Sequence, residues 1–163
     1  MTPIDDSAPV QARDMRYWLD SYSADHQHPI NRLLHWVCVP LILWCAIALM
    51  WTIPVPSSIG RPGFWAVCAL VLAFTWYWRQ SRRLGTALLI ALAVFALLTE
   101  LAYRELGPAS LRVLAFAVFV AAWIGQFVGH LIEGRRPSFL TDLAYLLVGP
   151  AWLMDKLLRR FGV

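Results

Sequence analysis

Apolar side chains occur in four long runs, which are separated by short stretches rich in charge, proline and glycine. The runs cover residues 36–53, 64–78, 84–103 and 111–132. A helix that crosses the hydrocarbon core of a bilayer needs about 20 predominantly apolar residues. Three runs have that length within a few residues, and the second reaches it only with its edges included. The pattern therefore predicts an all-α integral membrane bundle of about four transmembrane helices.

The two ends of the chain differ from these runs. Residues 1–16 are polar and contain proline, which predicts a loose terminus. Residues 17–35 are amphipathic but are interrupted by Pro29, and we expect a helix to restart just after this proline. Residues 139–158 mix apolar and charged positions, which favours interfacial or re-entrant helices over a fifth span. Nothing divides the chain, so residues 1–163 are expected to form a single membrane domain.

Composition supports the membrane interpretation and removes one class of partner. Hydrophobic residues make up 60% of the chain and charged residues 15%, whereas a soluble domain carries roughly 25% charged residues. The net charge of +4 could suggest a nucleic-acid partner. However, the arginines flank the apolar runs and form no separate basic face. We therefore expect membrane lipid, and no nucleic acid, as a partner.

The distribution of lysine and arginine predicts the orientation. If all four runs span the membrane, both termini lie on the same side as residues 79–83. This side then holds eleven basic residues, and the opposite side holds three. The eleven are Arg13, Arg16, Arg32, Arg79, Arg82, Arg83, Arg135, Arg136, Lys156, Arg159 and Arg160, and the three are Arg61, Arg104 and Arg112. Cytoplasmic loops are enriched in lysine and arginine. Both termini are therefore predicted to be cytoplasmic, at the inner membrane if the chain is bacterial.

The four histidines of the chain gather at one predicted membrane face. His26, His28 and His35 precede the first run, and His130 lies near the end of the fourth. Because an even number of spans separates them, all four are expected on the cytoplasmic side. Residues about 95 positions apart thus become candidates for one site.

Helical spacing adds polar neighbours to two of these histidines. Asn31 precedes His35 by four residues and Gln126 precedes His130 by four, so each pair shares a helix face. Glu133 follows His130 by three residues and shares its face. Ionisable groups beside an apolar helix body are costly and usually functional.

Two glycines in the fourth run predict a close helix contact. Gly125 and Gly129 form a small-xxx-small step, which lets another helix approach beside His130.

Spacing alone leaves three interpretations of the histidines open. They could bind one metal ion, since neutral imidazole suits Fe, Zn, Cu and Ni, with Asn31 and Gln126 fixing the imidazole tautomers. They could be ordinary residues at headgroup level, or two of them could bind a haem. Arg135 and Arg136 could likewise bind a carboxylate or lipid phosphate, or act only as basic anchors of topology.

Several enzyme classes have no support in the sequence. The chain contains no GxSxG, P-loop, GxGxxG or HExxH motif. A di-iron hydroxylase or desaturase needs a larger set of histidines or carboxylates than this chain offers.

Two segments resemble the motifs of a known family. The first is Tyr22–Pro40, in which Tyr-x3-His-x4-Asn-x3-His-x4-Pro is present. The second is Trp123–Pro137, in which QFxGHxxE precedes two arginines and a proline. Together they cover roughly a quarter of the chain. They are similar to the motifs of the small membrane-bound 2-hydroxy fatty acid dioxygenases.

The resemblance implies a reaction and a cofactor. The activity would be Fe(II)-dependent α-oxidation, in which a 2-hydroxy fatty acid and O2 give a fatty acid one carbon shorter. The substrate would bind iron through its carboxylate and hydroxyl, with its acyl chain among the apolar helices. A haem-binding membrane protein and a non-catalytic scaffold are the rival interpretations.

The resemblance also assigns residues. It implies iron binding by three histidines, roles in the reaction for three polar residues, and neutralisation of the substrate carboxylate by an arginine. The histidines are His26, His35 and His130, the polar residues are Asn31, Gln126 and Glu133, and the arginines are Arg135 and Arg136. Glu133 would complete the metal shell or orient a histidine. His28 stands where the family usually has asparagine, which leaves it as an additional ligand or a bystander.

Overall fold

The computed structural model describes residues 14–134 and 145–162 of the chain. These residues form helices joined by turns, without a strand among them. The five helices are α1 (Met15–Ala24), α2 (Pro29–Trp51), α3 (Phe64–Gln80), α4 (Arg82–Glu133) and α5 (Tyr145–Arg160). The prediction of an all-α fold is confirmed.

The first two helices begin where local capping residues allow. The side chain of Asp14 accepts a hydrogen bond of 2.9 Å from the backbone N–H of Tyr17, so α1 starts at Met15. The helix therefore begins inside the stretch predicted to be loose, whose residues 1–13 lie outside the described residues. The second helix has Pro29 in its first turn, which confirms the expected restart at this proline. Proline suits that position because its missing N–H would have no intrahelical partner.

The third and fourth apolar runs belong to one long helix with a sharp break. A loop was expected between residues 104 and 110, but α4 continues through them for 52 residues in total. The single non-helical residue is Gly107, with φ 75° and ψ 165°. Glycine adopts positive φ without strain, and Pro108 then fits the first turn of the following segment. The chain therefore changes direction at a single residue, where a loop was expected.

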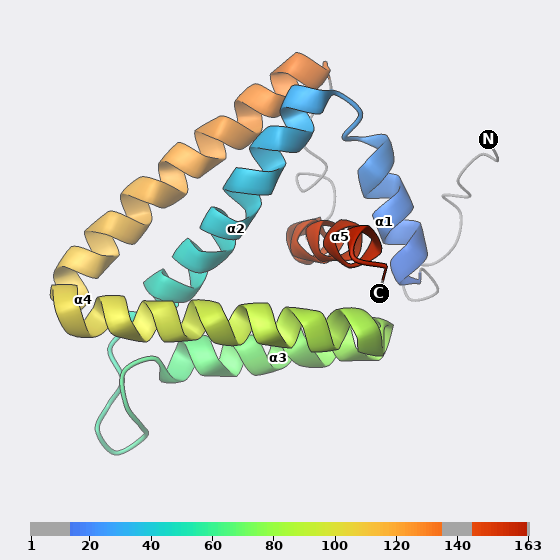
Figure 1. Cartoon of the computed structure of the whole chain (residues 1–163). Helices are drawn as coiled ribbons and strands as arrows, with labels where there is room; N and C mark the ends of the chain where they lie inside the picture. The colour runs from blue at the N-terminus through green and yellow to red at the C-terminus, as the bar shows by residue number, and fades with distance from the viewer. Residues whose placement is uncertain (1–13, 135–144, 163) are drawn as a thin grey trace.

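This break gives the molecule its shape. Figure 1 shows the first half of α4 running beside α3 and its second half running beside α2. The break thus forms one corner of a triangular outline. On the remaining side lies α1, and α5, seen end-on within the outline, packs against it. The start of α2 and the end of α4 meet at another corner, at the top of Figure 1.

The second half of α4 approaches α2 very closely. A Cβ atom built at Gly125 would lie 2.8 Å from the Cys38 sulfur, and one at Gly129 would overlap the Asn31 side-chain oxygen. The expectation of a close helix contact at this small-xxx-small step is confirmed.

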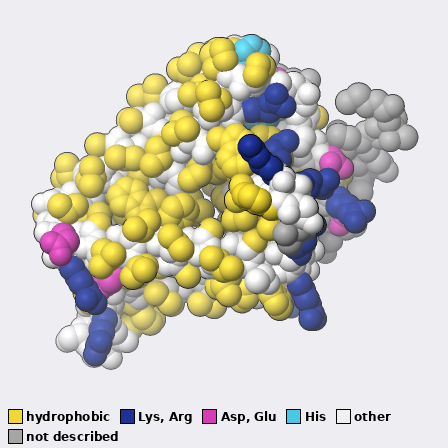
Figure 2. Space-filling view, viewed as in Figure 1, with side chains coloured by type: hydrophobic (Ala, Val, Ile, Leu, Met, Phe, Trp, Pro, Cys, Tyr) yellow, Lys and Arg dark blue, Asp and Glu magenta, His cyan; other side chains and the backbone are white. Residues whose placement is uncertain are grey.

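Within the described part of the chain, two helices are long and apolar enough to cross a membrane, namely α2 and α4. The third helix, α3, has 17 residues, which is fewer than the roughly 20 that a spanning helix needs. Figure 2 shows apolar side chains over much of one face, with Lys and Arg gathered on its right side and at its lower left corner. Length and composition thus indicate membrane association. Four spans and cytoplasmic termini stay predictions.

Candidate metal centre

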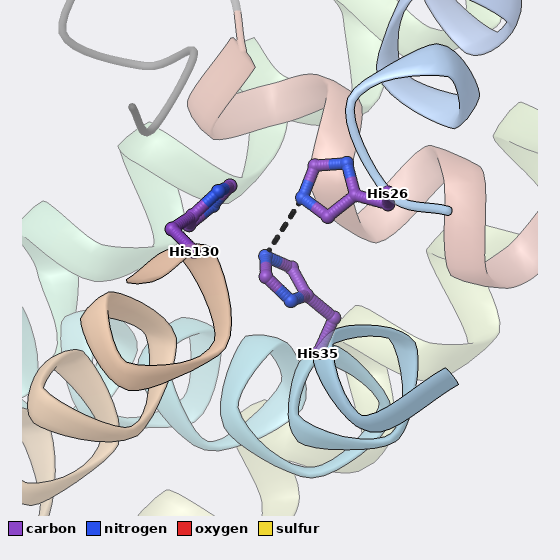
Figure 3. A group of neighbouring side chains, drawn as sticks. All are labelled: His26, His35 and His130. Atoms are coloured by element: carbon purple, nitrogen blue, oxygen red, sulfur yellow. Dashed lines mark hydrogen bonds between the residues drawn. The ribbon is translucent and has the colours of Figure 1, made fainter. Parts of the chain in front are cut away.

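Three histidines from three parts of the chain meet at the corner where α2 begins and α4 ends. His26 lies between α1 and α2, His35 on α2 and His130 in the last turn of α4. One ring nitrogen of each lies within 4.8 Å of those of the other two. All three side chains are buried, with 1–3% of their surface exposed. Figure 3 shows the three rings turned toward one another.

Backbone carbonyls fix the tautomers of two of these histidines. The Nδ1 atom of His26 lies 2.6 Å from the carbonyl oxygen of Tyr22. The Nδ1 atom of His35 lies 2.9 Å from the carbonyl oxygen of Asn31. A carbonyl oxygen only accepts, so each Nδ1 carries the proton and each Nε2 carries a lone pair.

These two lone pairs face each other. The Nε2 atoms of His26 and His35 are 3.0 Å apart, joined by the dashed line in Figure 3. With both Nδ1 atoms protonated, neither Nε2 has a proton to donate to the other, and this close pair suits a proton or a metal ion that both lone pairs can bind. Burial also lowers the pKa of His26. It therefore favours the neutral imidazole that a metal requires.

The third histidine also has an unsatisfied nitrogen. Nδ1 of His130 is buried and, within the described part of the chain, has no hydrogen-bond partner. Buried polar atoms are rarely left in this state, and exceptions often mark a missing ion or water. Three convergent imidazoles with spare lone pairs are a donor set that fits a divalent transition metal.

Glu133 fastens the end of α4 to the start of α2. One carboxylate oxygen accepts 2.9 Å from the backbone N–H of Gln27. The other accepts 2.8 Å from the N–H of His28 and 3.1 Å from the side-chain amide of Asn31. Both oxygens are thus engaged by the segment that carries His26. This arrangement favours positioning of a histidine over direct completion of the metal shell.

Asn31 and Gln126, the two amide residues predicted to orient the histidines, lie beside the cluster. Asn31 is fully buried. Its side-chain amide donates to Glu133, and its backbone carbonyl accepts from the His35 ring. Gln126 is buried on α4, and its side chain interacts with the His35 ring. Both lie where a residue that orients a histidine would be expected.

The fourth predicted histidine, His28, is not part of this cluster. The ring of His28 accepts a hydrogen bond of 3.2 Å from the N–H of Ile30 and caps α2. It is not among the three histidines that converge. Arg135 and Arg136 lie outside the described residues.

Comparison with known proteins identifies the family. The family model for 2-hydroxy-palmitic acid dioxygenase Mpo1-like proteins matches residues 12–161. The chain belongs to the Mpo1-like family. It is also 29% identical over 153 residues to the 2-hydroxy-palmitic acid dioxygenase MPO1 of Saccharomyces cerevisiae, a match that covers 91% of this chain and 82% of the yeast protein. No solved structure matches the chain.

In this Mpo1-like chain, two aromatic residues support the histidines from behind. Tyr22 stacks on His26, with ring centroids 4.1 Å apart and an interplanar angle of 14°. Trp152 of α5 lies against both rings, with centroids 5.3 Å from Tyr22 and 5.6 Å from His26. Its indole N–H donates 2.7 Å to the Ser23 hydroxyl. These contacts fix the orientation of the His26 ring.

Sequence reasoning gave neither aromatic residue a role in the site. Tyr22 is part of the first motif, and its spacing of four from His26 was an available signal. The sequence around Trp152 contains no such signal, because the residues that Trp152 contacts lie about 130 positions earlier in the chain.

Proposed function

We propose that this Mpo1-like chain is an Fe(II)-dependent dioxygenase that shortens 2-hydroxy fatty acids by one carbon. The bond between the carboxyl carbon and C2 breaks, and one O2 is consumed. The products are the shorter fatty acid, carbon dioxide and water, which balances the equation. The observation that carries the proposal is the convergence of three buried imidazoles, one of them with an unpaired nitrogen, in a chain of this family.

The three histidines are the residues that would hold the metal. His26 and His35 would bind through Nε2, because their Nδ1 atoms are bonded to backbone carbonyls. Their proximity to His130 completes a set of imidazole donors suited to iron. When bound, iron would supply the redox chemistry with O2 and the positive charge that attracts a 2-hydroxy carboxylate.

The surrounding residues would keep this set in place. The carbonyls of Tyr22 and Asn31 hold the Nδ1 protons, while Glu133 fastens the His26 segment to α4. Outer partners of this kind usually matter for metal affinity and activity. We assign Asn31, Gln126 and Glu133 to this positioning role. Arg135 and Arg136 are the candidates for neutralising the substrate carboxylate.

The ring geometry favours an ion over the two rival interpretations. The centroid of His35 lies 4.2 Å from that of His26 and 5.1 Å from that of His130. Rings this close leave no space for a porphyrin between them, unlike a bis-histidine haem site. A non-catalytic scaffold has no need for three convergent buried imidazoles, and the unpaired Nδ1 of His130 costs about 1–3 kcal/mol.

We also propose that the chain forms one domain that crosses the membrane four times, with cytoplasmic termini. The break at Gly107 supports this, because an unbroken helix of 52 residues would extend about 78 Å. The hydrocarbon core is only about 30 Å thick. Divided at the break, α4 provides two segments that are each long enough to cross.

Removing the metal is expected to abolish the activity reversibly. Protein stripped with a chelator should not shorten 2-hydroxypalmitate, and anaerobic addition of Fe(II) should restore shortening. Zn(II) suits the same imidazoles but has no redox chemistry, so it should bind without restoring activity. Mass spectrometry of the fatty acids measures each state. Full activity in the stripped protein, or equal activity with Zn(II), contradicts the assignment of iron.

A further inference from the structure

An interior cavity of about 430 Å³ opens directly from the histidine cluster. Its wall includes all three histidines and Gln126 at one end. The rest of the wall comes from Tyr22 of α1 and from residues of α2, α3, α4 and α5. A volume of this size is typical of a site for a small molecule.

The cavity follows one face of α2 away from the cluster. The α2 residues in its wall recur every three or four positions from His35 to Met50. Fifteen residues of α-helix rise about 22 Å. The cavity is therefore long and narrow, and it suits an extended chain better than a compact ligand.

Polarity changes along this length. The three histidines and Gln126 lie together near the start of α2, where Tyr22 stacks on His26 and Tyr77 belongs to the same buried cluster as Tyr22 and Val39. Beyond Val39, the wall residues of α2 are all aliphatic or Met50. At the far end, Ile47 and Leu92 belong to one buried apolar cluster, against which Met50 and Leu70 pack. The occupant that this wall matches has a polar head and a long apolar tail.

We propose that this cavity holds the acyl chain of the substrate and that its far end, near Met50, limits the chain length. The inference rests on the proposed function, since the polar head would lie at the histidines. The acyl chain runs along α2 past Ala46, a small residue in the wall. Ala46 lies eleven residues beyond His35, or about 16 Å along the helix.

Enlarging Ala46 tests this assignment. In Ala46→Phe, the added ring occupies the deep part of the cavity, so long chains lose their place while short chains keep theirs. An equimolar mixture of 2-hydroxy fatty acids of graded length is converted in one vessel, and the shortened products are quantified by mass spectrometry. We expect the ratio of long-chain to short-chain product to fall by about tenfold or more. This ratio does not depend on the amount of folded protein.

Two further measurements make the test decisive. Titration calorimetry with metal-stripped protein should show the same loss of affinity for long chains, without relying on turnover. Met50→Ala should shift the preference toward longer chains. The matched control is Ala93→Phe, which places the same ring on an exposed position of α4 outside the cavity wall. It should keep the wild-type ratio.

The outcomes separate the two proposals. If wild-type protein shortens no 2-hydroxy fatty acid, the proposed function fails. If wild-type protein is active but Ala46→Phe and Met50→Ala keep the wild-type ratio, only the cavity assignment is overturned. Should Ala46→Phe not fold, Ala46→Leu repeats the test with a smaller side chain.

Discussion

Replacing His35 with alanine is expected to lower chain-shortening activity by more than about 100-fold, the upper end of what loss of an outer-shell partner costs. His35 is central in the cluster, with its Nε2 atom 3.0 Å from that of His26 and its ring packed against His130. Its removal leaves two imidazoles, too few to hold iron firmly. Product formation and the iron content of the purified protein measure the effect.

The matched comparison is another histidine nearby. His28→Asn should keep the activity and the iron content of the wild type, because His28 caps α2 and asparagine is among the best N-cap residues. If His28→Asn loses iron as His35→Ala does, then His28 is a ligand after all. If His35→Ala keeps both iron and activity, the three-histidine site is wrong.

Gly129→Ala is expected to have the second-largest effect, through the packing of α4 on α2. The added Cβ would overlap the Asn31 side-chain oxygen and lie 3.3 Å from a Leu34 methyl. Overpacking a tight contact costs typically 1–3 kcal/mol, which exceeds the gain of up to about 1 kcal/mol from the helix propensity of alanine. Separating these helices moves His130 away from His35. We therefore expect lower thermal stability and at least a tenfold loss of iron affinity.

The control adds an even larger side chain, two carbons instead of one, to α4 on its outer side. Ala121 is exposed, so Ala121→Val should leave both the melting temperature and the iron affinity close to those of the wild type. If Gly129→Ala behaves as Ala121→Val does, the close approach of the helices is not required for the site.

The meeting of His35 and His130 could be predicted because it depends on two regular features, whereas His26 was assigned from the family resemblance and His28 does not converge with them. Helical spacing placed Asn31 beside His35 and Gln126 beside His130, and an even number of apolar runs placed both pairs at one end. The small-xxx-small step at Gly125 and Gly129 similarly predicted the helix contact that brings them together.

Other features of the site depend on contacts between distant residues, which no local pattern reveals. Glu133 shares a face with His130, but the three N–H groups that it accepts belong to residues more than 100 positions earlier. The break in α4 was placed in the correct stretch, yet a loop was expected there. The positive φ of Gly107 accomplishes the same change of direction in one residue.

The central claim is that O2 is consumed in shortening a 2-hydroxy fatty acid at the three-histidine site. The most direct test incubates Fe(II)-loaded protein with 2-hydroxypalmitate under ¹⁸O2 and analyses the fatty acids by mass spectrometry. We expect an acid one carbon shorter that carries one ¹⁸O atom, and no such acid without O2. Absence of the shorter acid across several chain lengths, or its formation without O2, would contradict the account.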